Sequence, residues 1–395
     1  MNQFLELEHK VMKLVKQIKP PKTKGDRIVR IINNFFYVYT GSQVQEVAME
    51  LSELDLPAIA VVNEKLNLLG LIKRADLETQ LSKPYGRELL QRTSVDELMV
   101  SPQIFVYNQS IAVIIEEIRD DFQNETIQYY ALVDKQQQFC GIFSSRTMLL
   151  YAAQTQQRDI ETAKVIQERI IPHYSHFSDD QCEFICSAVM QQAVGGDYYY
   201  VKQYSPNKWF FCLCDISGKG ISASIVVALL GGYMWNADFS KSMVKFIQGL
   251  NKLILQTFNL EKYFTGIFCK FDSKTGLLKY CDMGHGLMYL HRNHKFIPLQ
   301  SEAVNMPVGI INDISIEKKS ILLDNNDTIV LFSDGLSEQE NTLGKEFDIQ
   351  IISKSLEENP KNLKKAKIEI FEKFYQFKDT EVQHDDLSLL FCHKN

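Results

Sequence analysis

The stretch Phe211-Cys212-Leu213-Cys214-Asp215-Ile216-Ser217-Gly218-Lys219-Gly220 joins a hydrophobic run to a glycine-containing turn, with an aspartate at the junction. Aspartates occupy similar junctions in Gly195-Gly196-Asp197-Tyr198-Tyr199, Ile329-Val330-Leu331-Phe332-Ser333-Asp334-Gly335 and His384-Asp385-Asp386-Leu387-Ser388-Leu389-Leu390. A carboxylate at a strand end is held by the sheet yet emerges at its rim, so several such strands can direct oxygens to one point. Carboxylates, carbonyls and waters are the ligands that suit Mg²⁺ and Mn²⁺. The sequence therefore predicts an oxygen-ligand metal site.

Other segments occur in a fixed order around these motifs: the entry segment from Asp159 to Pro172, Met283-Gly284-His285 and Met306-Pro307-Val308-Gly309. In this combination the chain, from about Arg158 to its C-terminus, resembles the metal-dependent protein phosphatase (PPM) superfamily in its bacterial SpoIIE-like branch. The resemblance implies an α+β protein whose catalytic domain, residues 173–395, is an α-β-β-α sandwich. It also implies hydrolysis of phosphoserine and phosphothreonine in proteins. The usual substrates of this branch are phosphorylated anti-sigma-factor antagonists of the STAS type, which act in partner-switching pathways.

The resemblance also assigns roles to individual residues. Asp215 would bridge two Mg²⁺ or Mn²⁺ ions, with the Ile216 carbonyl as a further ligand. Asp197 would hold one ion or its waters, and Asp334 and Asp385 would complete the other site, so that Asp197 and Asp215 are the expected catalytic residues. Two ions roughly 3.5–4 Å apart lower the pKa of a bridging water and clamp the phosphoryl oxygens during in-line attack. The motifs contain no Cys-x5-Arg loop and no Ser/His/Asp ordering, which agrees with a water nucleophile.

Some positions depart from the family pattern or stay unassigned. Tyr200 stands where the family usually has an aspartate, which predicts a weaker outer shell around the metals. His285 could fix a loop or touch the substrate, and Lys219 could attract phosphate or simply be solvated. Asp386 should point the opposite way from Asp385 along a strand, so it is not assigned as a ligand.

Two other functions remain open. A catalytically weak pseudophosphatase could bind a phosphoprotein or relay the nucleotide state of the N-terminal region. A phosphatase for small phosphate esters would share the metals and differ only in its substrate.

The region before the phosphatase-like part contains an internal repeat. The segment from Ala60 to Ile72 aligns without gaps on the segment from Ala131 to Phe143, and each predicts a strand, a polar turn and a second strand. With the helices around them, residues 36–145 resemble a tandem cystathionine-β-synthase (CBS) pair. The segment Val95-Asp96-Glu97-Leu98-Met99 would open the second copy.

Tandem CBS pairs commonly bind adenine nucleotides, and the family's cue is a Thr or Ser followed three residues later by Asp. The first copy has Lys73 and Asp76, and the second has Ser144 and Thr147, so each copy keeps half of the cue. Asp76 could contact a ribose. Equally, it could lie in the first turn of a helix, where the helix dipole favours a carboxylate.

Two segments are expected to be helical. A linker helix is expected over residues 146–172, with no Gly or Pro before Pro172, which ends it. It could transmit a signal or simply pack on one domain. Residues 1–35 carry an amphipathic pattern that could form a dimer helix or a partner arm. A homodimer is expected.

Composition excludes some functions. The net charge of −6 argues against nonspecific nucleic-acid binding. Eight cysteines at irregular spacings, several inside apolar runs, indicate reduced, buried side chains. Cys182 and Cys186 are expected on a helix. No apolar run approaches the roughly 20 residues that span a bilayer, and no signal-peptide core is present, so a cytoplasmic protein without a membrane segment is expected.

Overall fold

The computed structural model describes residues 14–299 and 305–395, and the chain divides into two compact units, Met1–Gln157 and Arg158–Asn395. The helix expected over residues 146–172 is present as α6 (Ser145–Ile170). The division between the units falls inside this helix, and the expected domain boundaries at 145 and 172 stay predictions. Each unit is described by itself below.

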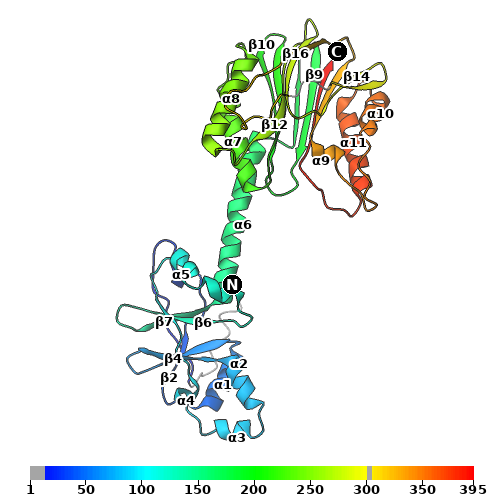
Figure 1. Ribbon diagram of the computed structural model, residues 1–395. Helices are drawn as coiled ribbons and strands as arrows, with labels where there is room; N and C mark the ends of the chain where they lie inside the picture. Colours follow the sequence, from blue (N-terminus) through cyan, green and yellow to red (C-terminus); the bar gives the residue numbers. More distant parts are fainter. Residues whose placement is uncertain (1–13, 300–304) are drawn as a thin grey trace. The chain divides into compact units, whose positions relative to one another are not determined.

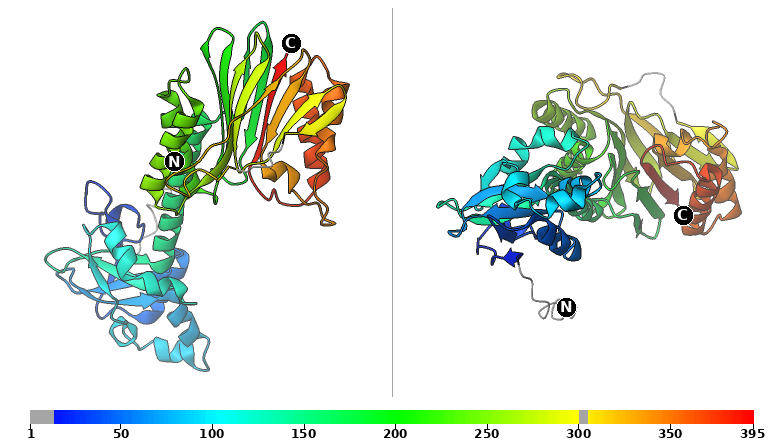
Figure 2. Two further views of the ribbon diagram at one scale, coloured as in Figure 1. Left: turned by 45° about the horizontal axis from the view of Figure 1, so that its top comes forward. Right: turned by 90° about the horizontal axis from the view of Figure 1, so that it is seen from below.

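The C-terminal unit stacks two antiparallel sheets, with helices on both outer faces (Figures 1 and 2). One sheet has the order β10 (Asp197–Ser205), β11 (Lys208–Ile216), β12 (Phe264–Asp272), β13 (Leu277–Met283) and β16 (Lys319–Leu322). The other has the order β15 (Lys295–Pro298), β14 (Met288–Arg292), β17 (Thr328–Phe332), β18 (Leu387–Lys394), β9 (Cys182–Val189) and β8 (Tyr174–Ser178). Helices α7 (Ile221–Trp235) and α8 (Met243–Phe258) cover the first sheet, and α10 (Gln350–Glu358) and α11 (Leu363–Lys378) cover the second.

Both faces of the central strands are buried. On β17, Ile329 and Leu331 belong to the core that the two sheets form with α7 and α8. Val330 and Phe332 belong to the core beneath α10 and α11. Because successive side chains of a strand point to opposite faces, a strand buried on both faces must be apolar throughout. In a strand such as β17, a charged residue can therefore stand only beyond the end, which is where Asp334 lies.

The expectation of a helix at Cys182 and Cys186 is wrong. Both residues lie on strand β9, which pairs with β8 and β18. A four-residue spacing places two side chains on one face of a strand as well as on one face of a helix, so spacing alone could not decide. All eight cysteines are free and buried.

The internal repeat is confirmed by the topology of the N-terminal unit. The first copy contains β2 (Phe36–Tyr39), α1 (Val44–Glu53), β3 (Ala58–Val62), β4 (Leu68–Lys73) and α2 (Arg74–Leu81). The second contains β5 (Ile104–Val106), α5 (Ile111–Glu117), β6 (Tyr129–Val133), β7 (Phe139–Ser144) and α6. In both, the first strand runs parallel to the second, which pairs antiparallel with the third. The turns also match, since Asn63 and Asp134 each accept two backbone N–H groups of their own turn.

The two copies exchange segments and share a core. Val95, in the short helix α4 (Val95–Leu98), packs in the core of the first copy rather than the second. Ile28, in a 3-10 helix at Ile28–Arg30, packs in the core of the second copy. A third cluster joins residues of both copies, including Ala60 and Ala131. The copies are therefore one packed unit.

The expected helical segment 1–35 is not helical in its described part. Residues 14–35 contain the short strand β1 (Lys16–Gln17), which pairs with β2, and the 3-10 helix. The backbone N–H groups of Leu14 and Val15 donate to the Glu50 carboxylate, and Val15 is buried. Strand pairing satisfies backbone groups that a helix would otherwise satisfy within itself. Residues 1–13 of this prediction lie outside the described residues.

The remaining helices are short: α3 (Gly86–Leu90), α9 (Asp334–Ser337) and a 3-10 helix at Arg119–Gln123. None of the helices in residues 14–299 and 305–395 has both the length and the apolar character needed to cross a bilayer.

The buried sandwich predicts a sharp contrast between two Leu→Ala substitutions. Leu390 on β18 is fully buried, and Leu343 is 77% exposed. We expect Leu390→Ala to lower the free energy of unfolding by about 2–5 kcal/mol, because it leaves a cavity. Leu343→Ala should change it by about 0.5 kcal/mol or less. Tryptophan fluorescence during urea unfolding measures this unit alone, since Trp209 and Trp235 are the chain's two tryptophans.

Candidate active site

The two sheets bring the predicted aspartates to one rim. Asp197 opens β10 and Asp215 lies near the end of β11, where the two residues are direct cross-strand partners. In the second sheet Asp334 follows β17, and Asp385 and Asp386 precede the neighbouring strand β18. Burial, followed by the charges of Asp334, Asp385 and Asp386, raises the pKa of Asp215 to about 7. Carboxylates from both sheets therefore act on the same carboxyl group.

The rim concentrates negative charge in a buried place. Burial first, and then the charges of Asp215 and Asp386, raise the pKa of Asp197 well above its usual range. The pKa of Asp334 is also raised, by burial and by Asp385. Lys219 opposes this charge, with its Nζ 2.9 Å from an Asp385 oxygen. This lysine, left unassigned from the sequence, is thus engaged with a proposed metal ligand.

The donor set fits hard divalent cations. The Oδ2 atom of Asp197 is buried without a hydrogen-bond partner among the described residues, which is costly unless another group satisfies it. Carboxylate oxygens are the preferred ligands of Mg²⁺ and Mn²⁺. The Ile216 carbonyl lies beside Gly196, since a Cβ built on that glycine would stand 2.8 Å from it.

The predicted metal ligands are not yet closed around a single point. Among the residues that the structure describes, no three His, Cys, Asp or Glu side chains are already gathered into a ready metal cage. Like charges repel one another in a buried site, and Asp385 is paired with Lys219. Closing the ligand set around cations would require Asp385 to exchange its lysine partner for a metal.

Asp386 anchors the backbone between the sheets. Its side chain is buried, with 4% exposed, and accepts hydrogen bonds from the N–H of Gln191 at 2.7 Å and of Gly196 at 2.5 Å. It thereby ties the second sheet to the segment that leads into Asp197. Sequence reasoning left this residue unassigned, and its contacts cross about 190 positions of the chain.

Glycine is required at positions 195 and 335, because the backbone at both positions passes close to Asp386. A Cβ on Gly195 would stand 2.2 Å from an Asp386 carboxylate oxygen, and a Cβ on Gly335 would stand 2.1 Å from the Asp386 carbonyl. Neither contact leaves room for a side chain. The glycines of the Gly-Gly-Asp and Ser-Asp-Gly motifs therefore allow the two sheets to meet at the rim.

Sequence reasoning missed Gln167 and Ser333. The Gln167 side chain, on α6, donates to the Gly195 carbonyl at 2.8 Å and accepts from the Gly195 N–H at 3.2 Å. Ser333 Oγ donates to the Asp386 carbonyl and accepts from the Ser388 N–H. The available signal for Gln167 was a polar residue next to Ile166 in the helix, and that signal is too common to single it out.

The side chains of His285 and Tyr200 both contact neighbouring protein groups. The His285 ring is 2.9 Å from the Phe332 carbonyl and 3.1 Å from Thr265 Oγ1, and burial lowers its pKa. These contacts hold the end of β17, next to Asp334. Tyr200 stacks near Tyr198 and packs against Phe239, on the strand face opposite to that of Asp197.

The N-terminal unit has a small cavity of about 180 Å³ between its two copies, lined by residues that include Lys73, Gln103 and Tyr129. Asp76 is exposed in the first turn of α2 and is not among the lining residues. Ser144 caps α6, since its Oγ accepts from the N–H of Thr147 at 3.2 Å. Asp76 and Ser144, the residues that the two copies keep from the nucleotide-binding cue, thus have different roles in the structure.

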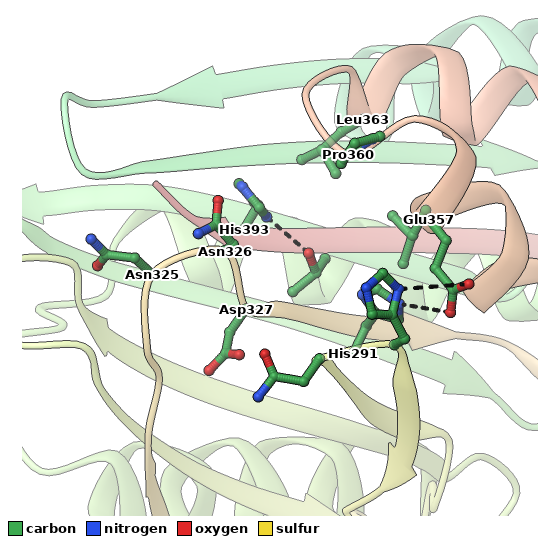
Figure 3. Close-up of a pocket in the computed structure, with 12 residues that line it drawn as sticks. His291, Asn325, Asn326, Asp327, Glu357, Pro360, Leu363 and His393 are labelled. Carbon is green, nitrogen blue, oxygen red and sulfur yellow. Dashed lines mark hydrogen bonds and ion pairs between the residues drawn. The ribbon is translucent and has the colours of Figure 1, made fainter.

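A second cavity, of about 290 Å³, lies at the ends of β14, β17 and β18 opposite to the aspartates (Figure 3). His291 Nε2 stands 3.6 Å from a Glu357 oxygen, which is longer than a hydrogen bond. His393 is 2.8 Å from Thr328 Oγ1. His393 thus has a hydrogen-bond partner within the pocket, whereas His291 Nε2 has none among the described residues.

This chain is similar to known bacterial proteins. Residues 205–395 match the family model for stage II sporulation protein E (SpoIIE). The phosphoserine phosphatase RsbU of Bacillus subtilis (strain 168) is 26% identical over 212 residues, which cover 51% of this chain and 60% of RsbU. Stage II sporulation protein E of the same organism is 22% identical over 302 residues, covering 66% of this chain and 36% of that protein. The chain thus spans less than two thirds of the length of both relatives.

Among solved structures, the SiaA-PP2C domain of Pseudomonas aeruginosa superposes with a TM-score of 0.52 at 16% identity. The match covers 62% of this chain and 99% of that domain, and at this identity it establishes the fold alone. The C-terminal unit therefore contains a segment similar to stage II sporulation protein E and has the mixed α/β fold of the SiaA-PP2C domain.

The close approach at Gly195 predicts opposite effects for two Gly→Ala substitutions. Gly195→Ala should lower the free energy of unfolding by about 1–3 kcal/mol, because the new methyl group displaces the Asp386 carboxylate. Gly232 lies in α7 with nothing within 4 Å of its Cβ position. Gly232→Ala should therefore raise stability by about 0.5–1 kcal/mol. Urea unfolding measures both variants, and equal effects would contradict the packing described here.

Proposed function

We propose that this protein is a divalent-metal-dependent phosphatase of phosphoserine and phosphothreonine in proteins. The proposal rests chiefly on the cross-strand pair Asp197 and Asp215, which meets Asp334 and Asp385 at one buried rim with an unsatisfied Asp197 oxygen. The SpoIIE-type domain and the RsbU relative support the reaction class. The substrate class follows from the same resemblance.

The proposed ligand set is Asp197, Asp215, Asp334, Asp385 and the Ile216 carbonyl. Two Mg²⁺ or Mn²⁺ ions would supply the Lewis acidity that makes a water nucleophilic and neutralises the phosphoryl oxygens. The sheets fix Asp197 and Asp215 in register before any ligand arrives, which lowers the cost of organising the site. Lys219, held beside Asp385, adds positive charge at the edge that an anionic substrate would approach.

The overall reaction adds water across the phosphate ester. Water oxygen bonds to phosphorus, the bond from phosphorus to the serine oxygen breaks, and the serine oxygen takes up a proton. The products are inorganic phosphate and an unmodified hydroxyl side chain, so no phosphorylated enzyme needs to form.

The decisive assay is hydrolysis of para-nitrophenyl phosphate and of a phosphoserine peptide with Mn²⁺, with Mg²⁺ and with chelator. We expect metal-dependent turnover that Asp215→Asn lowers by about a thousandfold or more, since this change removes a charged ligand from the site. Circular dichroism should show that the variant stays folded. Absence of turnover with both metals, accompanied by phosphopeptide binding, would instead support the pseudophosphatase. Tyr200 is the sequence feature that favours this alternative, but its side chain lies on the strand face opposite to that of Asp197.

We further propose that the N-terminal unit is a tandem CBS-type sensor. In the second part of this proposal, the protein is a cytoplasmic homodimer that dephosphorylates a STAS-type protein in a partner-switching pathway. The repeated topology and the cavity between the copies support the first part of this proposal. The RsbU and SpoIIE relatives suggest the second.

A nucleotide at the N-terminal unit is testable by calorimetry. We expect AMP or ATP to bind the full chain, and Asp76→Ala to weaken binding by about tenfold if its carboxylate accepts the ribose hydroxyls. Glu78→Ala, a charge-matched change on the same helix, should leave binding unchanged. No heat with either nucleotide would leave the repeats a structural pair, and equal weakening by both variants would remove Asp76 from the site.

A further inference from the structure

The cavity at the strand ends opposite to the aspartate rim collects three histidines and a glutamate. His291 comes from β14, His294 from the turn between β14 and β15, Glu357 from the end of α10, and His393 from β18. The proposed phosphatase reaction uses none of these residues. Their gathering in one cavity therefore needs an explanation of its own.

Two of the ionisable groups that line this cavity are engaged by other protein groups. The Asp327 carboxylate accepts from Arg292 Nε at 2.9 and 3.0 Å. The His393 ring is 2.8 Å from Thr328 Oγ1. These contacts account for Asp327 and His393 without a ligand.

The other two imidazoles face the Glu357 carboxylate without bonding to it (Figure 3). His291 Nε2 is 3.6 Å from Oε1, and His294 Nδ1 is 3.8 Å from Oε2, so each ring faces a different carboxylate oxygen. Both distances exceed that of a hydrogen bond. By contrast, the rings of His176 and His173 stand 3.0 and 3.2 Å from their glutamates. The pairs in the cavity are thus wider than other His–Glu pairs of this chain.

The wider spacing is close to that of two ligands of one metal ion. A zinc ion that binds nitrogen and oxygen at about 2.0–2.1 Å in a tetrahedron holds neighbouring ligand atoms about 3.3 Å apart. Distances of 3.6 and 3.8 Å need only a small closure to reach that value. Among the described residues the three donors are not yet gathered at one point, which is equally true of the aspartates at the rim.

The His291 ring and the Glu357 carboxylate are prepared for a ligand. His291 Nε2 is buried and has no hydrogen-bond partner in the described part of the chain, which is costly unless another group satisfies it. Burial also lowers the pKa of His291, and the neutral ring is the form that binds a metal. Ser353 Oγ donates to Glu357 Oε1 at 3.2 Å, and such a contact orients a metal-binding carboxylate.

His294 stands at a turn position where glycine is the usual residue. Asn293 and His294 have positive φ angles of 48° and 62° in the two-residue loop that joins Arg292 to Lys295. Loops of this kind favour Asn followed by Gly, because a side chain at positive φ is strained. The His294 side chain is 82% exposed, so packing does not explain why an imidazole stands there. Its position beside Glu357 does.

We propose that His291, His294 and Glu357 form a binding site for one Zn²⁺ ion, with water as the fourth ligand. Imidazole nitrogens and a carboxylate oxygen are ligands that suit Zn²⁺, whereas Mg²⁺ prefers oxygen ligands. The ion joins the β14–β15 turn to α10. The proposal does not depend on the proposed phosphatase function, because no residue of the aspartate rim takes part.

The ordinary alternative is that the two imidazoles form only ion pairs with Glu357 when they are protonated. The two explanations differ in their dependence on zinc. Ion pairs alone give no Zn²⁺ binding that depends on His294, whereas a metal site loses most of its affinity when one ligand is removed.

The first test measures Zn²⁺ affinity by competition with a chromophoric chelator, using the full chain in saturating Mg²⁺. We expect one Zn²⁺ per chain, and His294→Asn to weaken its binding about a hundredfold or more, since even the loss of a group that only orients a ligand costs up to that much. Asparagine tolerates the positive φ of this turn. His176→Asn removes a half-exposed imidazole from the pair with Glu183 and should leave the affinity unchanged. Equal Zn²⁺ affinity in the native chain and His294→Asn would overturn the proposal.

The second test separates this site from the aspartate rim, which could itself take up Zn²⁺. We expect Glu357→Gln to lose the bound Zn²⁺ and Asp215→Asn to keep it, and the reverse result would refute the site. Zn²⁺ should also raise the urea midpoint of Asp215→Asn but not that of Glu357→Gln, because a ligand of the folded state stabilises it. Metal-dependent hydrolysis without zinc binding at His294 would leave the proposed function standing and refute only this inference.

Discussion

The hydrogen bonds of Asp386 are the contacts on which the active-site rim depends. The proposed metal site needs aspartates from two different sheets, and separate sheets can slide relative to one another unless something fixes their ends. Asp386 comes from the strand end of one sheet and accepts the N–H groups of Gln191 and Gly196, which lead into the other. A carboxylate that accepts several backbone N–H groups is well stabilised when buried. The glycines at 195 and 335 leave the space that this arrangement requires.

The surrounding sandwich accounts for how such a concentration of charge is tolerated. Clustered carboxylates disfavour the folded state, and the raised pKa values of Asp197, Asp215 and Asp334 express that cost. Two extensive cores lie beside the rim, and strands such as β17 contribute apolar side chains to both. The hydrophobic effect of those cores offsets the repulsion. The stable sandwich can therefore hold a site whose carboxylates repel one another. Bound cations would relieve that repulsion, which favours their binding.

Local patterns predicted the features that depend on local chemistry. Aspartates that interrupt doubly buried strands are visible in the sequence, and so is a gapless repeat such as the one from Ala60 to Ile72. The errors and omissions share a different cause. Cys182 and Cys186 fit a helix or a strand equally well, and their pairing with β18 lies more than 200 residues away in the sequence. Asp386 and Gln167 have roles that only the assembled tertiary structure defines.

Residues at both ends of helix α6 pack against folded cores. Its first turns complete the core of a repeat whose two copies exchange segments, so a change at either copy affects a single packed body. At its other end Gln167 bonds to Gly195, and Ile171, which follows the helix, joins the core of the C-terminal unit. A helix of 26 residues is about 39 Å long and has no flexible residue along its length. Each end of the helix is therefore fixed by the core of its own unit.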